Sequence, residues 1–427
     1  MENIQLETIR KYNLWDNPET QFGIPRPSYT DELYRYIGNR MIKVLTGQRR
    51  VGKSYLLRQL ASKLINAGVS ASNILIINKE YSAFDFIATN KDLDELIRLY
   101  KRTLNVTDRY FVLIDEVQEI AGWETAINSY SQDYTENVEI FITGSNSKLL
   151  SSELATRISG RYVTFNIMPL SFDEYCDFYS MPRDRSGYIR YMQSGGLPAL
   201  INLHDEEMKR NYVSALCDTI MLKDIVAHYG VKDVRLLSEL FAYIVSTASS
   251  LVSIPNIVNY LKSKGTNASY LTISSYLNYL SEAYLIHRVE RSAIRGKEIL
   301  SGPCKYYAND LAFNNYLYSN HMTGTGYMLE NLVFLELLRA GYHPTVGTLP
   351  GKEIDFVAER NGNRLYIQVA YSIDDPHTRE REYAPLLEIL PAYEKWVVTL
   401  DDFAPTPPAG ILRIPAWELQ KHLRAKT

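Results

Sequence analysis

The segment that most constrains the fold of this 427-residue chain is a loop with two glycines, a lysine and a serine, Gly47-Gln48-Arg49-Arg50-Val51-Gly52-Lys53-Ser54. It follows the β-branched apolar run 41–47 and opens the amphipathic run 54–68, so the sequence predicts a strand, a tight loop and a helix. The glycines let the loop curl, which turns backbone N–H groups inward beside the positive end of the helix. This pattern predicts a phosphate-binding loop.

Individual residues of the loop have distinct expected roles. The Lys53 ammonium is expected to reach the β- and γ-phosphates, and the Ser54 hydroxyl to ligate Mg²⁺. The residues expected to hold the nucleotide are Gly47, Gln48, Arg49, Arg50, Val51, Gly52, Lys53, Ser54 and Tyr55.

A second acidic element follows in the same unit. The apolar run 109–116 ends in Asp115 and Glu116. An acidic strand end by itself is usually a solvated turn, but downstream of a phosphate-binding loop it has the Walker B arrangement. We expect Asp115 to hold the Mg²⁺ shell and Glu116 to orient or deprotonate the attacking water. Together the two elements predict binding of ATP and Mg²⁺, and ATP hydrolysis.

Five further positions have more than one interpretation each. The strand 138–145 is followed by Asn146, which either contacts the γ-phosphate or the attacking water, or caps the next helix. Thr143 and Ser145, at the end of that strand, share these alternatives. Arg157 and Arg161 are each either an arginine finger acting on a neighbouring subunit, a sensor, or part of a surface salt bridge.

Composition limits the class of protein. Hydrophobic residues make up 46% and charged residues 22%, and the formal net charge is −3, so the chain as a whole is not indicated to bind polyanions. Three widely spaced cysteines predict neither a zinc site nor disulfides. The first residues do not resemble a secretory signal, and the apolar runs are strand-sized, so we expect a cytoplasmic protein without membrane contact.

Periodicity predicts an α/β protein with several domains. Strands alternate with helices over 40–145, which favours a parallel sheet. Helices dominate after about residue 170, and two helical runs, 253–265 and 272–295, are followed by a strand-like run, 285–290, in the outline of a winged helix. From about residue 320 the pattern is again mixed. The predicted segments are 1–24, an ATPase core 25–168, a helical lid 169–235, the winged helix 236–320 and a C-terminal domain 321–427.

DNA contact by the winged helix is weighed against interdomain packing. Basic residues in this region are Lys262, Lys264, Arg288, Arg291, Arg295 and Lys297. Such residues are able to contact DNA phosphates. The second helix has no Arg or Lys in 272–285, so the sequence does not predict base-specific contacts in the major groove. We expect at most weak, non-specific contact.

Several motifs together resemble those of bacterial AAA-type ATPases that carry an uncharacterised C-terminal domain. They are GQRRVGKS (47–54), LIDEVQ (113–118), ITGSNS (142–147), SGRY (159–162), MPLSFDEY (168–175) and GGLP (195–198). This resemblance implies an AAA-like core, a helical lid, a winged helix and a restriction-endonuclease-like domain.

The C-terminal domain resembles a PD-(D/E)xK nuclease core with a defect. Glu330 and Asp355 match its acids, but Gln368 stands in the E/Q place and Ala370 where a lysine belongs. Glu353 shares a strand face with Asp355 and is weighed as a partial substitute, whereas Lys352 is expected on the other face. Since that chemistry needs a metal and a lysine, we expect a degenerate site without DNA cleavage.

The sequence therefore favours an ATPase whose turnover drives domain rearrangement, as a possible homo-oligomer. The alternatives are a DNA-acting machine, a nucleotide-dependent switch with an unknown protein partner, and an ATP-regulated, Mg²⁺-dependent nuclease.

Overall fold

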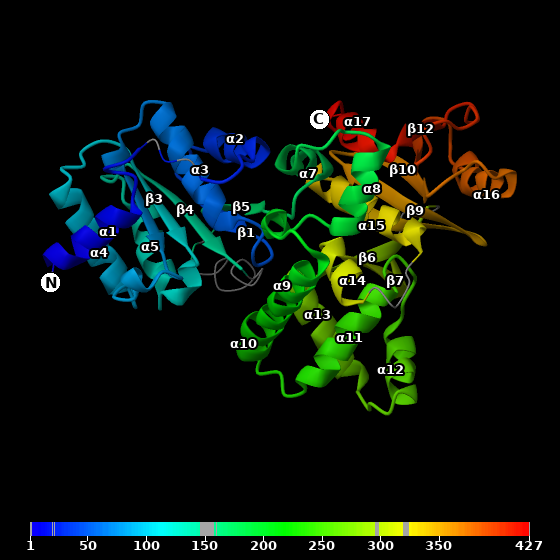
Figure 1. Ribbon diagram of the computed structural model, residues 1–427, viewed down its shortest axis with the longest axis horizontal. Helices are drawn as coiled ribbons and strands as arrows, with labels where there is room; N and C mark the ends of the chain where they lie inside the picture. The colour runs from blue at the N-terminus through cyan, green and yellow to red at the C-terminus, as the bar shows by residue number, and fades with distance from the viewer. Residues whose placement is uncertain are drawn as a thin grey trace. The chain divides into compact units, whose positions relative to one another are not determined.

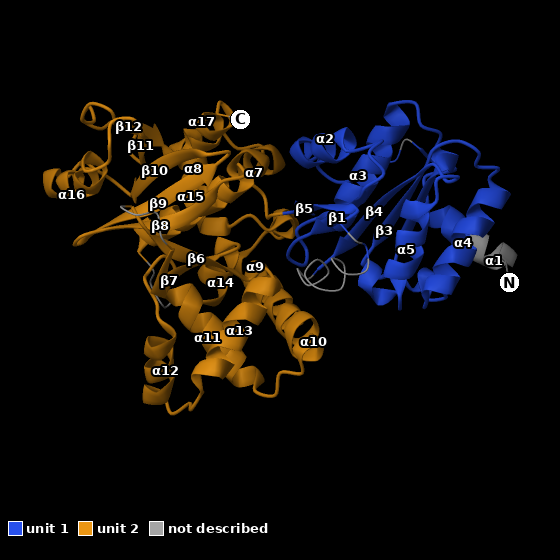
Figure 2. Cartoon of the chain, turned by 180° about the vertical axis from the view of Figure 1, so that it is seen from behind, with its two compact units in different colours: residues 1–167 blue, residues 168–427 orange. Residues whose placement is uncertain are grey.

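The chain forms two compact units, residues 1–167 and 168–427 (Figure 2). The computed structural model describes residues 2–18, 20, 22–145, 158, 160–294, 299–318 and 324–426. The unit boundary lies one residue before the predicted end of the ATPase core, and the finer division of the second unit stays a prediction.

Unit 1 is built on a five-stranded sheet in the order β2-β3-β4-β1-β5, in which every pair is parallel. The strands are β1 (Ile42–Thr46), β2 (Ile74–Asn78), β3 (Tyr110–Asp115), β4 (Val138–Gly144) and β5 (Tyr162–Asn166). β1 lies inside the sheet, which places the loop that follows it at the carboxyl edge, where open parallel sheets bind ligands.

Helices cover both faces of this sheet (Figure 1). One face packs against α1 (Glu2–Tyr12), α4 (Asn90–Thr103) and α5 (Trp123–Gln132), the other against α2 (Pro27–Arg35) and α3 (Lys53–Asn66). On β3, Val112 and Ile114 join the first core and Phe111 and Leu113 the second. Burial on both faces explains why β2 and β3 are almost continuously apolar.

Unit 2 combines a helical part with a seven-stranded mixed sheet in the order β12-β11-β10-β9-β8-β6-β7. Its strands are β6 (Ile286–Ala293), β7 (Ile299–Ala308), β8 (His343–Leu349), β9 (Lys352–Arg360), β10 (Asn363–Ala370), β11 (Glu394–Thr399) and β12 (Leu412–Pro415). Its helices are α7 (Phe172–Tyr179), α8 (Arg185–Ser194), α9 (Glu206–Thr219), a π-helix (Ile220–Val226), α10 (Ala227–Tyr229), α11 (Val234–Ser246), α12 (Ile254–Ser263), α13 (Tyr270–Glu282), α14 (Leu311–Leu317), α15 (Thr325–Arg339), α16 (Pro376–Leu387) and α17 (Leu419–Arg424).

The strand pair after α13 belongs to the same sheet as the C-terminal strands. β6 pairs antiparallel with β7, and its residues Arg291 to Ala293 run parallel to β8. The elements expected of a winged helix are present in order, although the helix predicted over 272–295 ends at Glu282. The hairpin thus continues into the C-terminal sheet, which a separate winged-helix domain would not do.

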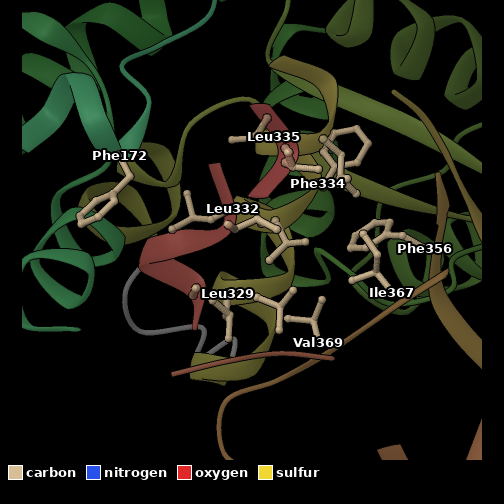
Figure 3. Close-up of a cluster of buried hydrophobic side chains, with 14 of the residues drawn as sticks. Phe172, Leu329, Leu332, Phe334, Leu335, Phe356, Ile367 and Val369 are labelled. Carbon is tan, nitrogen blue, oxygen red and sulfur yellow. The ribbon is translucent and has the colours of Figure 1, made fainter. Parts of the chain in front are cut away.

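The largest core of unit 2 lies between α15 and the sheet (Figure 3). Leu329 and Leu332 of α15 project toward Val369 of β10. Phe334, also on α15, packs near Phe356 of β9. α16 packs on the opposite face of the sheet. In the described ranges, no helix is long and apolar enough to span a membrane.

Candidate nucleotide-binding site

The predicted phosphate-binding loop connects β1 to α3, as the sequence indicates. Gly47 has a φ of +143°, and a Cβ added there would lie 2.1 Å from the carbonyl oxygen of Ile167. Gly52 is the N-cap of α3 with a φ of +100°. Both positions therefore require glycine, one for space and conformation and the other for conformation.

The Lys53 side chain lies across this loop and is almost fully buried. Its Nζ donates to the carbonyl oxygens of Gly47, at 2.8 Å, and Gln48, at 3.0 Å. Gln48 and Arg49 are also buried, and Arg49 Nη1 lies 2.8 Å from Glu80 Oε1. The ammonium is thus held at the loop by carbonyl oxygens that anionic phosphate oxygens can replace.

Arg26 supports the loop from outside the motif, a role that the sequence analysis missed. Its side chain is only 3% exposed, and Nη1 donates to the carbonyl oxygen of Val51 at 2.9 Å. Helix α2 begins at Pro27, so Arg26 is its N-cap residue. In the sequence, an arginine directly before a proline that can start a helix is a local signal that could have marked it.

Thr143 on the neighbouring strand contacts both Asp115, the last residue of β3, and Glu116, which follows it. Ile114 pairs with Ile142, which places Asp115 beside Thr143. The Thr143 hydroxyl donates to Asp115 Oδ1 at 2.6 Å and accepts from the backbone N–H of Glu116 at 3.0 Å. Thr143 was expected to contact the nucleotide or cap a helix; in the structure its hydroxyl holds the Asp115 carboxylate and the backbone of Glu116.

Asp115 has the features that a magnesium ligand needs. Its carboxylate is buried, and Oδ2 has no hydrogen-bond partner among the described residues. Burial raises the pKa of Asp115, and hydrogen bonds from Ser54 and Thr143 oppose that shift. An unpaired, buried carboxylate oxygen next to the Ser54 hydroxyl is a donor set that fits Mg²⁺.

Glu116 lies just beyond the strand in an uncommon backbone conformation. Its φ is +54°, and its side chain is 7% exposed. Gln118 Nε2 donates to Glu116 Oε2, so the carboxylate is held from the same short segment. Backbone strain of this kind is often retained where a functional group must be aimed.

The remaining predicted residues fall into two groups. Tyr55 is 57% exposed on the first turn of α3, and Asn146 and Arg157 lie outside the described residues. Arg161 lies at the amino edge of the sheet, because its carbonyl oxygen accepts from the N–H of Ile42, the first residue of β1. The phosphate-binding loop leaves the other end of β1, so the structure does not bring Arg161 to the site of its own chain.

Comparisons with known proteins agree with this geometry. Residues 39–176 match the family described as AAA domain, and residues 185–324 match a domain of unknown function, DUF8612. An uncharacterized protein of Haemophilus influenzae is 36% identical over 404 residues, which cover 93% of this chain and 99% of that protein. The chain belongs to this family of AAA-type P-loop ATPases. A second member, an uncharacterized protein of Methanocaldococcus jannaschii, is 31% identical over 84% of this chain and 79% of its own length.

Solved structures resemble this AAA-type chain only distantly. The Walker-type ATPase of Pyrococcus abyssi aligns with a TM-score of 0.45 and 17% identity, covering 71% of this chain and 99% of that one. The Aeropyrum pernix Orc1 protein in complex with DNA aligns with a TM-score of 0.34 and 13% identity, covering 75% and 96%. The assignment therefore rests on the family matches and on the site itself.

The predicted second site is also assembled, but around a residue that the sequence analysis missed. Glu330, Glu353, Asp355 and Gln368 all line one pocket of about 760 Å³ in unit 2. Lys305 of β7 lies among the three acids. Lys352, weighed as a substitute for the absent lysine, instead pairs with Glu388 at 2.5 Å.

Proposed function

We propose that this AAA-type protein hydrolyses ATP with Mg²⁺ and couples turnover to rearrangement of unit 2. The observation that carries the proposal is the buried, partnerless Oδ2 of Asp115, next to Ser54 and within the electrostatic reach of Lys53. A buried anion without a partner is costly, and a divalent cation would remove that cost.

Each residue of the site has a distinct proposed task. The N–H groups of the loop 47–54 bind the phosphates, and Lys53 exchanges its two carbonyl partners for β- and γ-phosphate oxygens. Ser54 and Asp115 would hold Mg²⁺, which neutralises charge on the phosphates. Glu116, aimed by the Thr143 hydroxyl and by Gln118, orients the attacking water and accepts its proton.

The proposed coupling follows from what lies beneath the loop. Gly47 packs directly on the carbonyl of Ile167, whose N–H donates to the carbonyl oxygen of Thr46 at 2.7 Å. Ile167 is the last residue of unit 1, so a change in the loop on binding or hydrolysis acts on the point where the chain passes into unit 2.

Thermal melting with and without Mg-ATP tests nucleotide binding at this loop. A ligand at about 100 times its Kd adds about 2.7 kcal/mol to stability, so the Tm of the wild type should rise. Lys53→Ala should lose that rise while retaining its fold. Lys63→Ala, which removes an exposed lysine from the same helix, is the matched control and should keep it. An unchanged rise and unchanged turnover in Lys53→Ala would contradict the assignment.

Arg161 is proposed to act on a neighbouring subunit. The exposed Arg161 lies at the opposite edge of the sheet from its own loop, about 13 Å along β1 at 3.3 Å per residue. Mixing Arg161→Ala with Lys53→Ala subunits should then restore part of the turnover, since each mixed interface can contain one intact site. Turnover that is independent of protein concentration, without complementation, would argue against this role.

Contact with DNA is proposed only as weak and non-specific. Arg291 is used internally, since its Nε donates to the carbonyl oxygen of Pro303 at 2.9 Å, and Arg295 and Lys297 lie outside the described residues. Binding measured at several salt concentrations, with and without an ATP analogue, should show a small salt slope. A steep slope with nucleotide present would favour a DNA-acting machine over a switch with a protein partner.

A further inference from the structure

The pocket in unit 2 contains a lysine surrounded by three carboxylates that come from separate elements. Lys305 Nζ lies 3.0 Å from Glu330 Oε1 of α15 and 2.6 Å from Glu353 Oε1 of β9. It also lies 3.6 Å from Oδ1 of Asp355, again on β9. One ammonium thus occupies the point on which three acids converge.

This lysine is a permanent cation. Its side chain is 4% exposed, and burial alone would lower its pKa. The charges of Glu330, Asp355 and Glu353 outweigh burial and raise the pKa of Lys305 above its ordinary value. The ammonium therefore stays protonated at neutral pH, where it is neither a base nor an amine nucleophile.

Two of the three acids are also held by hydrogen bonds that do not involve the lysine. The β9–β10 ladder ends at the pair of Phe356 and Ile367. Beyond it, Asp355 Oδ2 accepts from the N–H of Val369 at 2.8 Å, and Gln368 Oε1 accepts from the N–H of Asp355 at 3.0 Å. Tyr307 donates its hydroxyl to Glu330 Oε1 at 2.7 Å. Asp355 and Glu330 therefore have anchors other than the lysine, whereas Glu353 is 34% exposed and meets the cluster through Lys305.

A divalent cation needs carboxylate oxygens at about 2.0–2.6 Å around one centre, and here the ammonium fills that centre. In the part of the chain that the structure describes, no group of three His, Cys, Asp or Glu side chains is arranged to hold a metal ion.

We propose that Lys305 is the resident cation of this cluster: the wild-type cluster takes up no divalent ion, and removal of the lysine opens a divalent-cation site formed by Glu330, Glu353 and Asp355. The proposal is independent of the nucleotide site.

This assignment gives a different reason for the expected absence of nuclease activity. The sequence attributes the loss of nuclease activity to Gln368 and Ala370. In the structure, Gln368 Nε2 donates to Glu382 Oε2 at 2.9 Å. The position that a metal ion would occupy between the acids is filled by the Lys305 side chain of β7. A phosphodiester approaching the pocket would meet carboxylates without a metal to bridge to them, so replacing Ala370 by lysine should not by itself restore cleavage.

Binding of Mn²⁺ to the nucleotide-free, full-length protein, followed by electron paramagnetic resonance, tests the proposal. Asp355→Asn alone, with Lys305 still in place, should bind the same number of Mn²⁺ ions as the wild type. Lys305→Ala should bind one additional equivalent, and Lys305→Ala/Asp355→Asn should lose it again. Any Mn²⁺ at the nucleotide site is common to all four proteins and cancels in the comparison.

A stability measurement covers the case in which Lys305→Ala folds poorly. Lys305→Ala leaves the buried acids without their cation, so its Tm should fall and should rise again with Mn²⁺. Lys305→Ala/Glu353→Gln, which removes one acid together with the cation, should melt above Lys305→Ala in the absence of metal. An Mn²⁺ equivalent in the wild type that Asp355→Asn abolishes would overturn the proposal, as would a Lys305→Ala protein that gains no Mn²⁺ and no Mn²⁺-dependent stability.

Discussion

Thr143→Val replaces a hydroxyl by a methyl group of nearly the same size and removes the link between the two acids of the nucleotide site. The Thr143 hydroxyl lies 2.6 Å from Asp115 Oδ1 and 3.0 Å from the N–H of Glu116, and the residue is fully buried. Valine fills the space but can neither donate nor accept. Both bonds are therefore lost without a cavity being formed.

The expected cost follows from these two bonds. A hydrogen bond to a charged group contributes about 1.5–3 kcal/mol, and a buried N–H left without an acceptor costs about 1–3 kcal/mol. We expect Thr143→Val to lose about 3 kcal/mol of the free energy of unfolding, which is about 6–12 °C in Tm for a unit of this size. Turnover should also fall, since Glu116 loses its backbone tether.

Thr143→Ser is the matched control, because it keeps the hydroxyl and loses only a methyl group, worth about 1 kcal/mol. Differential scanning calorimetry and phosphate release on the two variants give both readouts. If Thr143→Val has the same Tm and the same rate of ATP turnover as Thr143→Ser, the hydroxyl does not hold the two acids and this reasoning is wrong.

Three other predictions concern groups outside the nucleotide site. Burial raises the pKa of Asp310 to about 6, so between about pH 4 and 6 the folded state holds a proton that the unfolded chain has released. The free energy of unfolding should therefore fall as pH rises through that window. Urea unfolding of Asp310→Asn should show a weaker dependence of this free energy on pH over the same window. Lys43→Met should lose about 3–5 kcal/mol in urea unfolding, because it leaves the buried carboxylate of Glu139 without its cation; a loss below 1 kcal/mol would contradict a tightly coupled pair. Burial raises the pKa of Cys176 and of Cys217 to about 12, so a thiol reagent at pH 8 should modify them only after unfolding, and rapid reaction in the native protein would count against their burial.

The first half of the chain could be predicted well because its signals are local. The loop 47–54 and the acidic end of β3 each contain their chemistry within a few residues, and the parallel sheet follows from strands buried on both faces. The turn between β9 and β10 has an equally local signal in the pair Asn361-Gly362, and both residues have positive φ, as a two-residue hairpin turn demands. Arg26 was missed since its partner, Val51, lies 25 residues away.

The second unit could be predicted only in part, because its sheet depends on long-range pairing. β7 includes Gly302 and Pro303, which weaken any strand pattern, and so the strand that carries Lys305 was not expected. A lone lysine in the apolar run 303–308 is a signal of a buried cation, but nothing in the sequence says which acids it meets. The sequence identified the acids themselves, but only the structure shows that Lys305 of β7 neutralises them.

Phosphate release by Glu116→Gln, measured beside its ATP binding, tests the central claim most directly. The amide keeps the size of the side chain and loses the ability to accept a proton. We predict that Glu116→Gln binds Mg-ATP like the wild type and turns it over at least about 100-fold more slowly. A Glu116→Gln protein that binds ATP and retains the wild-type kcat would contradict the assignment of Glu116 as the residue that activates water.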